Sequence, residues 1–134
     1  MQALVLIAHG SRRQASNQEV MNLTHRLRHT ANARFPLIET GFLELASPSI
    51  PEAIESCIEC GATSVILVPY FLAAGRHVTE DIPRIVKAVA QQHRRVAIHI
   101  AEHIGMSDSM TRVILASAGG VSAQTVDPDL QQAG

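Results

Sequence analysis

The sequence is poor in aromatic and charged residues, and each shortage excludes a class of protein. It has no Trp, one Tyr and three Phe among 134 residues, which leaves few platforms for stacking nucleic-acid bases. Its 11 Lys and Arg nearly balance its 12 Asp and Glu, and no basic block occurs. We therefore expect neither nucleic acid nor a membrane surface as a partner.

Long hydrophobic runs are also missing. No apolar run approaches the ~18 residues that a membrane span needs, and no basic stretch precedes the first apolar residues as in a secretory signal. These absences predict a soluble, cytoplasmic protein. Charged residues make up 17% of the chain, below the ~25% of an average domain, which is a weak indication of a homo-oligomer.

Only two cysteines are present, and they form the C-x-x-C sequence Cys57 to Cys60. A redox pair of this kind normally begins a helix, where the helix dipole stabilises a thiolate. Here the pair ends a predicted helix, and no second pair completes a zinc site. We interpret the cysteines as small hydrophobic residues.

The chain is rich in alternating strand and helix patterns, which are typical of a parallel sheet covered by helices. Strands are predicted at residues 3–8, 37–45, 64–70 and 96–101. The first and third are almost continuously apolar, so they belong at the centre, and right-handed crossovers then give the strand order 2-1-3-4. We expect one α/β domain over residues 1–120 and a polar tail over 121–134.

Four helices are predicted from apolar residues that recur at helical spacing. Gly61 should end the second helix, and Pro83 is tolerated because it falls in the first turn of the third. The stripes are Val20, Leu23, Leu27 and Ala31; Ile50, Ala53, Ile54, Cys57 and Ile58; Ile82, Ile85, Val86 and Val89; and Met110, Val113 and Ile114.

This strand order predicts where a ligand would bind. In open α/β sheets the site lies at the carboxyl ends of the strands where the winding reverses, here between the first and third strands. The loops at that point, residues 9–13 and 71–77, each contain one histidine, His9 and His77. Neither loop has a nucleotide-binding glycine pattern.

Most of the seven histidines have simpler explanations. His25 and His29 have the i, i+4 spacing of a helical metal pair, but they point away from the apolar stripe and lack the Glu of a zinc-protease motif, so we interpret them as solvent-facing. His93 and His99 are expected to be surface residues. His103 lies at the correct edge of the sheet, but beside an edge strand.

His9 and His77 differ, because together they can form an open two-imidazole site for a borderline divalent metal. Glu44 and Glu80 are nearby carboxylates for which a functional and a structural role are both open. Asp81 is well placed to cap the third helix. Arg12, Arg13 and Arg76 flank the two loops, where they either pair with acidic groups of a ligand or are simply solvated.

Four segments carry a resemblance to a known family: LVLIAHGS (4–11), GFLELASPSI (41–50), VILVPYF (65–71) and GRHVTEDIP (75–83). They resemble the short CbiX-type sirohydrochlorin chelatases (CbiX/SirB-like) of the class II chelatase family. This resemblance implies a flavodoxin-like sheet with helices on both faces, and a homodimer in which the short chain corresponds to one half of the longer two-lobed enzymes. It covers roughly residues 3–90.

By this resemblance the chain is a lyase that inserts Co²⁺, or alternatively Fe²⁺ or Ni²⁺, into sirohydrochlorin for cobalamin or siroheme synthesis, without an organic cofactor. His9 and His77 would bind the metal and assist pyrrole deprotonation, with Glu44 and Glu80 in support. We expect Ser11, Arg12, Arg76 and Leu72 to contact the tetrapyrrole. A metal or tetrapyrrole carrier and a flavodoxin-like interaction module remain alternatives.

Overall fold

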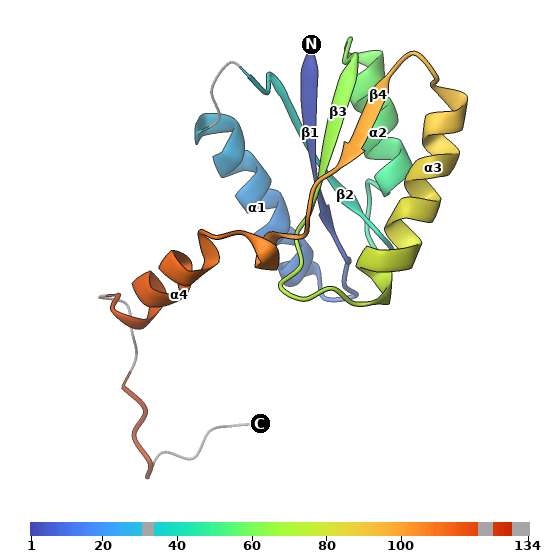
Figure 1. The fold of residues 1–134 in the computed structure, drawn as a ribbon. Coiled ribbons are helices and arrows are strands. Elements are labelled where there is room, and N and C mark those ends of the chain that lie inside the picture. The colour runs from blue at the N-terminus through green and yellow to red at the C-terminus, as the bar shows by residue number, and fades with distance from the viewer. Residues whose placement is uncertain (31–33, 121–124, 130–134) are drawn as a thin grey trace.

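The computed structural model describes residues 1–30, 34–120 and 125–129 of the chain. They contain a four-stranded, fully parallel sheet with the order β2-β1-β3-β4, which confirms the predicted order (Figure 1). The strands are β1 (Gln2–Ala8), β2 (Leu37–Phe42), β3 (Ser64–Pro69) and β4 (Ala97–Ile100).

Helices cover both faces of the sheet, as predicted. α1 (Gln14–Thr30) lies on one face, and α2 (Ile50–Glu59) and α3 (Ile82–Gln92) lie on the other (Figure 1). The short turns η1 (His77–Asp81) and η2 (Ile104–Met106) follow β3 and β4, and α4 (Met110–Ala118) comes last. None of the helices in the described segments has the length and apolarity needed to cross a bilayer.

The core lies between the sheet and the pair α2 and α3. Alternate residues of β1 and β3 face it, because successive side chains in a strand point to opposite faces. Val5, Ile7, Val65 and Leu67 are fully buried there against Ile54. This packing fixes the register of β1 against β3, since a slip of one residue would move the apolar set to the other face.

Local capping defines α2. The Ser49 side chain accepts a hydrogen bond from the Glu52 backbone N–H at 3.2 Å, and the Ser49 N–H donates to Glu52 Oε1 at 3.0 Å. Hydrogen bonding from the Ser49 backbone N–H, and then from the Ser49 side chain, lowers the pKa of the Glu52 carboxyl, because it favours the ionised form. Gly61 follows with a φ of 103°, so the predicted glycine at the end of this helix is confirmed.

The second strand is shorter than predicted. β2 ends at Phe42 instead of residue 45. Leu45 has a φ of 65°, which is incompatible with an extended strand, and Phe42 N–H donates to Pro48 O at 2.8 Å across the turn that results. The apolar character of Leu43 and Leu45 therefore does not indicate that the regular strand continues to residue 45. The prediction for residues 43–45 was wrong.

The buried side of α1 also differs from its apolar stripe. Its buried residues are Asn17 and Thr24, whereas Val20, Leu23 and Leu27 are only partly buried. Thr24 Oγ1 lies 2.6 Å from Thr40 Oγ1 of β2, so this helix is attached to the sheet by a buried hydroxyl pair. Ala31 lies outside the described residues.

α4 extends away from the sheet (Figure 1). Met110 is the only one of its residues that is even partly buried, and Val113, Ile114 and Leu115 are 52%, 60% and 71% exposed. Of the predicted tail, residues 125–129 are exposed, and the remainder after Gly120 lies outside the described residues.

The two cysteines should differ in reactivity. Cys57 is buried and Cys60 is exposed, and burial raises the pKa of the Cys57 thiol from 9.0 to about 11. We expect a thiol reagent at pH 8 to modify Cys60 in the folded protein and Cys57 only after unfolding, as measured by mass spectrometry. Equal labelling rates would contradict the burial of Cys57.

The same pKa predicts a loss of stability at high pH. The neutral Cys57 thiol contributes fully below the unfolded pKa, near 9, and this contribution is lost as the pH rises toward about 11. The free energy of unfolding, measured with urea, should therefore fall more between pH 9 and 11 in the parent than in Cys57→Ala. If the free energy of unfolding falls equally with pH in the two proteins, the predicted contribution of Cys57 is wrong.

Candidate functional site

The candidate site lies at the carboxyl edge of the sheet, where backbone hydrogen bonds connect the loops that follow the strands. Leu43 N–H donates to Ala8 O at 2.9 Å, and Tyr70 N–H donates to Ile7 O at 2.7 Å. Ala101 N–H donates to Leu67 O at 2.8 Å. The strand pairing thus continues past the named strands, so these loops are held by the sheet itself.

His9 follows β1 directly and lies beside Glu44. His9 Nε2 is 3.1 Å from Glu44 Oε1, and their side chains are 42% and 54% exposed. The two backbones are also joined, since Glu44 N–H donates to His9 O at 3.0 Å. An imidazole and a carboxylate are therefore paired between the loops after β1 and β2, beside the predicted switch point, and both are partly open to solvent.

Gly10 makes this pairing possible. Its φ is 92°, and a Cβ at this position would lie 1.8 Å from the carbonyl oxygen of Glu44. No side chain fits this space, and L-residues rarely adopt this conformation. The glycine therefore brings the loop after β1 into contact with the loop after β2, which places His9 against Glu44.

The Asn17 side chain of α1 binds the backbone of Ser11, and the sequence analysis missed this residue. Ser11 N–H donates to Asn17 Oδ1 at 2.9 Å, Asn17 Nδ2 donates to Ser11 O at 2.7 Å, and Ser11 Oγ accepts from Arg13 N–H at 3.0 Å. Asn17 is only 7% exposed. Its signal was available, because it is a polar residue three positions before Val20 on the apolar stripe of α1.

The second loop of the site forms the turn η1. Val78 N–H and Thr79 N–H both donate to Gly75 O, at 3.2 and 3.1 Å. This turn places the backbone of His77 at its start, on the carboxyl side of β3. The His77 side chain lies outside the described part of the structure.

The other predicted site residues in this loop are on the surface. Arg76 Nε lies 3.7 Å from Glu80 Oε2, and these side chains are 80% and 70% exposed. Leu72 is 71% exposed. A Cβ on Gly105 would lie 1.8 Å from Leu72 O, so the loop after β4 packs tightly on the loop after β3.

Three further residues can now be placed. Arg12 is exposed at the start of the loop before α1. Asp81 precedes α3, but its side chain makes no capping hydrogen bond and its Oδ1 accepts from Arg84 Nη2 at 3.2 Å, so the predicted cap was wrong. His103 is half-buried at the start of η2.

Among the described side chains, which do not include that of His77, no three His, Cys, Asp or Glu residues gather closely enough to hold a metal ion. The distance between His9 and Glu44 by itself suits two ligands of one metal ion. Two ligands at about 2.0–2.2 Å from one ion lie about 3 Å apart, close to the observed 3.1 Å between Nε2 and Oε1.

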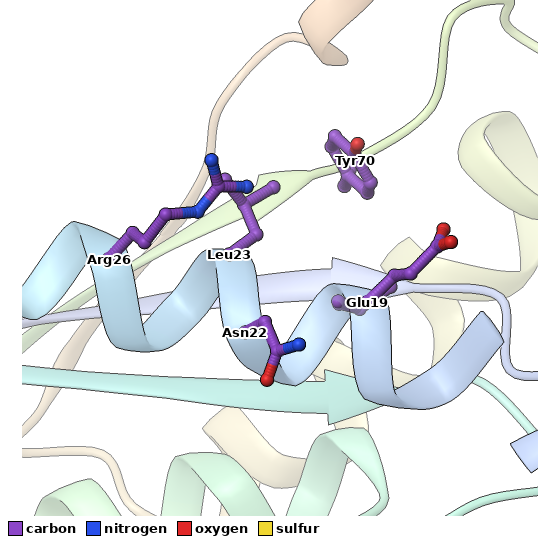
Figure 2. Close-up of a pocket in the computed structure, with 6 residues that line it drawn as sticks. Glu19, Asn22, Leu23, Arg26 and Tyr70 are labelled. Carbon is purple, nitrogen blue, oxygen red and sulfur yellow. The ribbon is translucent and has the colours of Figure 1, made fainter. Parts of the chain in front are cut away.

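A cavity of about 520 Å³ lies beside this edge, between α1 and the end of β3. Figure 2 shows Glu19, Leu23 and Arg26 extending from α1 on the side where Tyr70 lies. Tyr70 is 41% exposed. The sequence analysis did not predict any residue that lines this cavity as a site residue, and His9 is not part of the lining.

The parallel order β2-β1-β3-β4, with an imidazole and a carboxylate at its carboxyl edge, defines an open α/β protein, a class whose ligands bind at this edge of the sheet. The CbiX family model matches residues 3–119. The chain belongs to the CbiX family.

Sequence similarity to named chelatases is consistent with membership of this family. The chain is 41% identical over 93 residues to the sirohydrochlorin cobaltochelatase of Methanocaldococcus jannaschii, an alignment covering 69% of this chain and 64% of that protein. It is 34% identical to the sirohydrochlorin cobaltochelatase of Sulfolobus acidocaldarius, covering 85% and 87%. With the sirohydrochlorin ferrochelatase of Priestia megaterium it shares 31% identity, covering 85% and 42%.

Solved structures support the same fold. The sirohydrochlorin chelatase SirB from Bacillus subtilis subspecies spizizenii, in complex with cobalt, has a TM-score of 0.80 at 26% identity and covers 96% of this chain and 56% of its own. The putative cobalamin biosynthesis CbiX protein from Marinobacter aquaeolei has a TM-score of 0.77 at 26% identity, covering 88% and 94%. The chain thus spans 64% or less of several curated relatives and nearly all of one structural relative.

Substitution of Gly10 tests how the site is built. Gly10→Ala forces a Cβ toward Glu44 O at a positive φ, so we expect a loss of about 1–2 kcal/mol from the backbone conformation and about 1–3 kcal/mol more from overpacking. Urea unfolding measures the loss.

Gly61→Ala is the matched control. Gly61 also has a positive φ, 103°, but a Cβ there meets no atom within 4 Å. It should therefore show only the conformational loss. Equal destabilisation by the two substitutions would contradict a packing role for Gly10.

Proposed function

We propose that this protein inserts a divalent metal, Co²⁺ foremost, into sirohydrochlorin. The observation that carries the proposal is the pair of His9 and Glu44 at the carboxyl edge of the sheet, in a chain whose family relatives are named sirohydrochlorin chelatases. Metal insertion needs a site that binds an ion and then releases it. A half-exposed pair meets that need better than a closed four-ligand site.

The metal is a substrate of this reaction, and His9 and His77 are its proposed ligands. In our proposal His9 Nε2 and Glu44 Oε1 approach the ion together, because their 3.1 Å separation suits two ligands of one metal. The backbone of His77 lies on the carboxyl side of β3, in the loop that follows this strand. The replacement of hydrating water by these ligands prepares the ion for transfer to the pyrrole nitrogens.

Insertion also requires two pyrrole N–H protons to leave the macrocycle. Neutral imidazole accepts a proton well near neutral pH, so one of His9 and His77 can take a pyrrole proton once its ring nitrogen has released the ion, and a nearby carboxylate can take the other. Glu44 is the better placed of the two supporting carboxylates, since it lies against His9. Glu80 lies against Arg76, so we propose for it the weaker role of adjusting the charge around that arginine.

Sirohydrochlorin carries several carboxylate side chains, and the arginines at this edge suit them. Arg12 is exposed, and the pair of Arg76 and Glu80 is long and largely solvated, so either guanidinium is available at little energetic cost. The Leu72 side chain offers an apolar contact to the ring. The Ser11 Oγ already accepts from Arg13 N–H, so its O–H is left to donate to a substrate carboxylate.

Relatives named for cobalt and for iron both match this chain. We favour Co²⁺, with Fe²⁺ and Ni²⁺ as alternatives, because His nitrogen and carboxylate oxygen accept all three ions. The product would then serve cobalamin or siroheme synthesis. We assign the activity to residues 1–120 and to the cytoplasm, where the free thiols of Cys57 and Cys60 are stable.

We further propose that the protein acts as a homodimer. α4 exposes Val113, Ile114 and Leu115, and the α1 face of the sheet leaves Tyr70 and the cavity beside it open. Burial of both apolar surfaces against a second copy would remove them from water. The second copy would also supply the other wall around a wide, flat macrocycle.

The activity is tested by adding CoCl₂ and sirohydrochlorin to tag-free protein under anaerobic conditions and following the visible spectrum. His9→Ala and His77→Ala should each slow insertion at least about 100-fold. Glu44→Gln, which keeps the shape and removes the charge, should reduce the rate less. His99→Ala, which removes an exposed histidine of β4, is the control and should match the parent.

Two outcomes contradict this function. If His9→Ala and His77→Ala each insert metal as fast as the parent, the assigned roles are wrong. If the parent binds sirohydrochlorin stoichiometrically without exceeding the spontaneous rate, the protein is a carrier instead of an enzyme.

The dimer is tested by light scattering at assay concentration. Ile114→Asp places a charge on the exposed apolar side of α4 and should shift the protein toward monomer. Ala116→Asp is the control, because this exposed residue lies about 200° around the helix from Ile114. A monomeric parent, or equal effects of both variants, would contradict the proposed interface.

A further inference from the structure

A second pair of metal-binding side chains lies on α1, away from the site described above. His25 and His29 are one helical turn apart and both exposed. Their Nε2 atoms lie 3.2 Å apart, and their ring centroids are 4.6 Å apart with the ring planes at 77°. The two imidazoles therefore share a hydrogen bond through Nε2, and these two nitrogens lie together on the exposed side of the helix.

This separation matches that of two nitrogens on one metal ion. Bonds of about 2.0–2.1 Å to zinc at a tetrahedral angle place two nitrogens about 3.3 Å apart, and a right angle places them about 2.9 Å apart. The observed 3.2 Å between Nε2 atoms lies between these values. An ion could bind with little movement of either ring.

We propose that His25 and His29 form a surface chelating site for a borderline divalent cation such as Ni²⁺, Zn²⁺ or Cu²⁺. Neutral imidazole is the preferred protein ligand of these ions. With two protein ligands the remaining positions hold water, so the ion is exchangeable. This makes the site one for transient capture, in contrast to a structural zinc site with four protein ligands.

Two arginines, Arg26 and Arg28, each adjoin one of the two histidines in sequence. Arg26 extends from α1 on the side where Tyr70 lies (Figure 2). The Arg28 side chain turns toward the sheet, where Nε donates to Ile38 O at 2.8 Å and Nη2 to Glu39 Oε2 at 3.2 Å. Its positive charge is thus directed away from the pair and partly neutralised. One turn earlier, Gln18 donates to Asn22 at 2.9 Å, and both of these residues are uncharged.

The pair is also distinct from the proposed chelatase site. His9 lies at the carboxyl edge, and α1 begins there at Gln14. His25 is eleven residues further along the helix, about 16 Å along its axis at 1.5 Å per residue. An ion held by His25 and His29 therefore does not share ligands with His9, and the inference does not depend on the proposed function.

Titration of the tag-free His9→Ala/His77→Ala protein with NiCl₂ in a calorimeter isolates this site, because the proposed catalytic ligands are absent. We expect about one ion per chain. Adding His29→Ala should weaken the affinity at least about tenfold, since a chelate becomes a single ligand. Adding His99→Ala, which removes one exposed histidine elsewhere, should leave the affinity unchanged.

Thermal unfolding gives a second readout that does not use activity. A metal that joins residues i and i+4 stabilises the turn between them, so NiCl₂ should raise the Tm of the double variant. It should not raise the Tm once His29→Ala is added. The proposal is overturned if the double variant binds no Ni²⁺, or if His29→Ala leaves the affinity and the Tm shift unchanged.

Discussion

The contact of Gly10 with the carbonyl oxygen of Glu44 is the constraint on which the carboxyl edge of this protein depends. With a φ of 92° and no space for a Cβ, Gly10 allows the loops after β1 and β2 to meet backbone to backbone. The hydrogen bond from Glu44 N–H to His9 O follows from that approach, as does the 3.1 Å separation of His9 Nε2 and Glu44 Oε1. Side-chain chemistry at the edge is thus set by a residue that has no side chain.

A close contact between a glycine and a carbonyl oxygen also joins the loops on the other half of the sheet. Gly105 approaches Leu72 O as closely as Gly10 approaches Glu44 O, and Gly105 N–H donates to Phe71 O at 3.0 Å. Two glycines therefore join the loops in pairs, β1 with β2 and β3 with β4. The buried apolar strands provide the rigid platform, and the hydrogen bond from Tyr70 N–H to Ile7 O connects the two central strands at the switch point. The site proposed to bind and release an ion is thus built on loops that are themselves well supported.

The spacing of apolar residues and the hydrophobicity of the strands were enough to predict the strand order, because a parallel sheet buried on both faces has a strong apolar signal. They failed where polar contacts decide the structure. The apolar residues after Phe42 resemble a strand, but the positive φ of Leu45 ends it. Asn17 lies one turn before the apolar stripe of α1, and only the fold shows that it forms hydrogen bonds with the backbone of Ser11. The pairing of His9 with Glu44 was open in the sequence because it depends on a contact between distant loops.

The incomplete covering of the α1 face explains why the stripe of that helix is only half-buried. α2 and α3 together cover their face, and Ile54 and Ile82 are fully buried. On the opposite face α1 is the helix that contacts the sheet, while α4 extends away with its apolar residues in solvent. Val20 and Leu23 consequently line a cavity with Tyr70 instead of a core. An α/β sheet normally has helices over both faces because each face is apolar. The cavity beside Tyr70 and the exposed side of α4 are therefore the two surfaces that the proposed homodimer would bury.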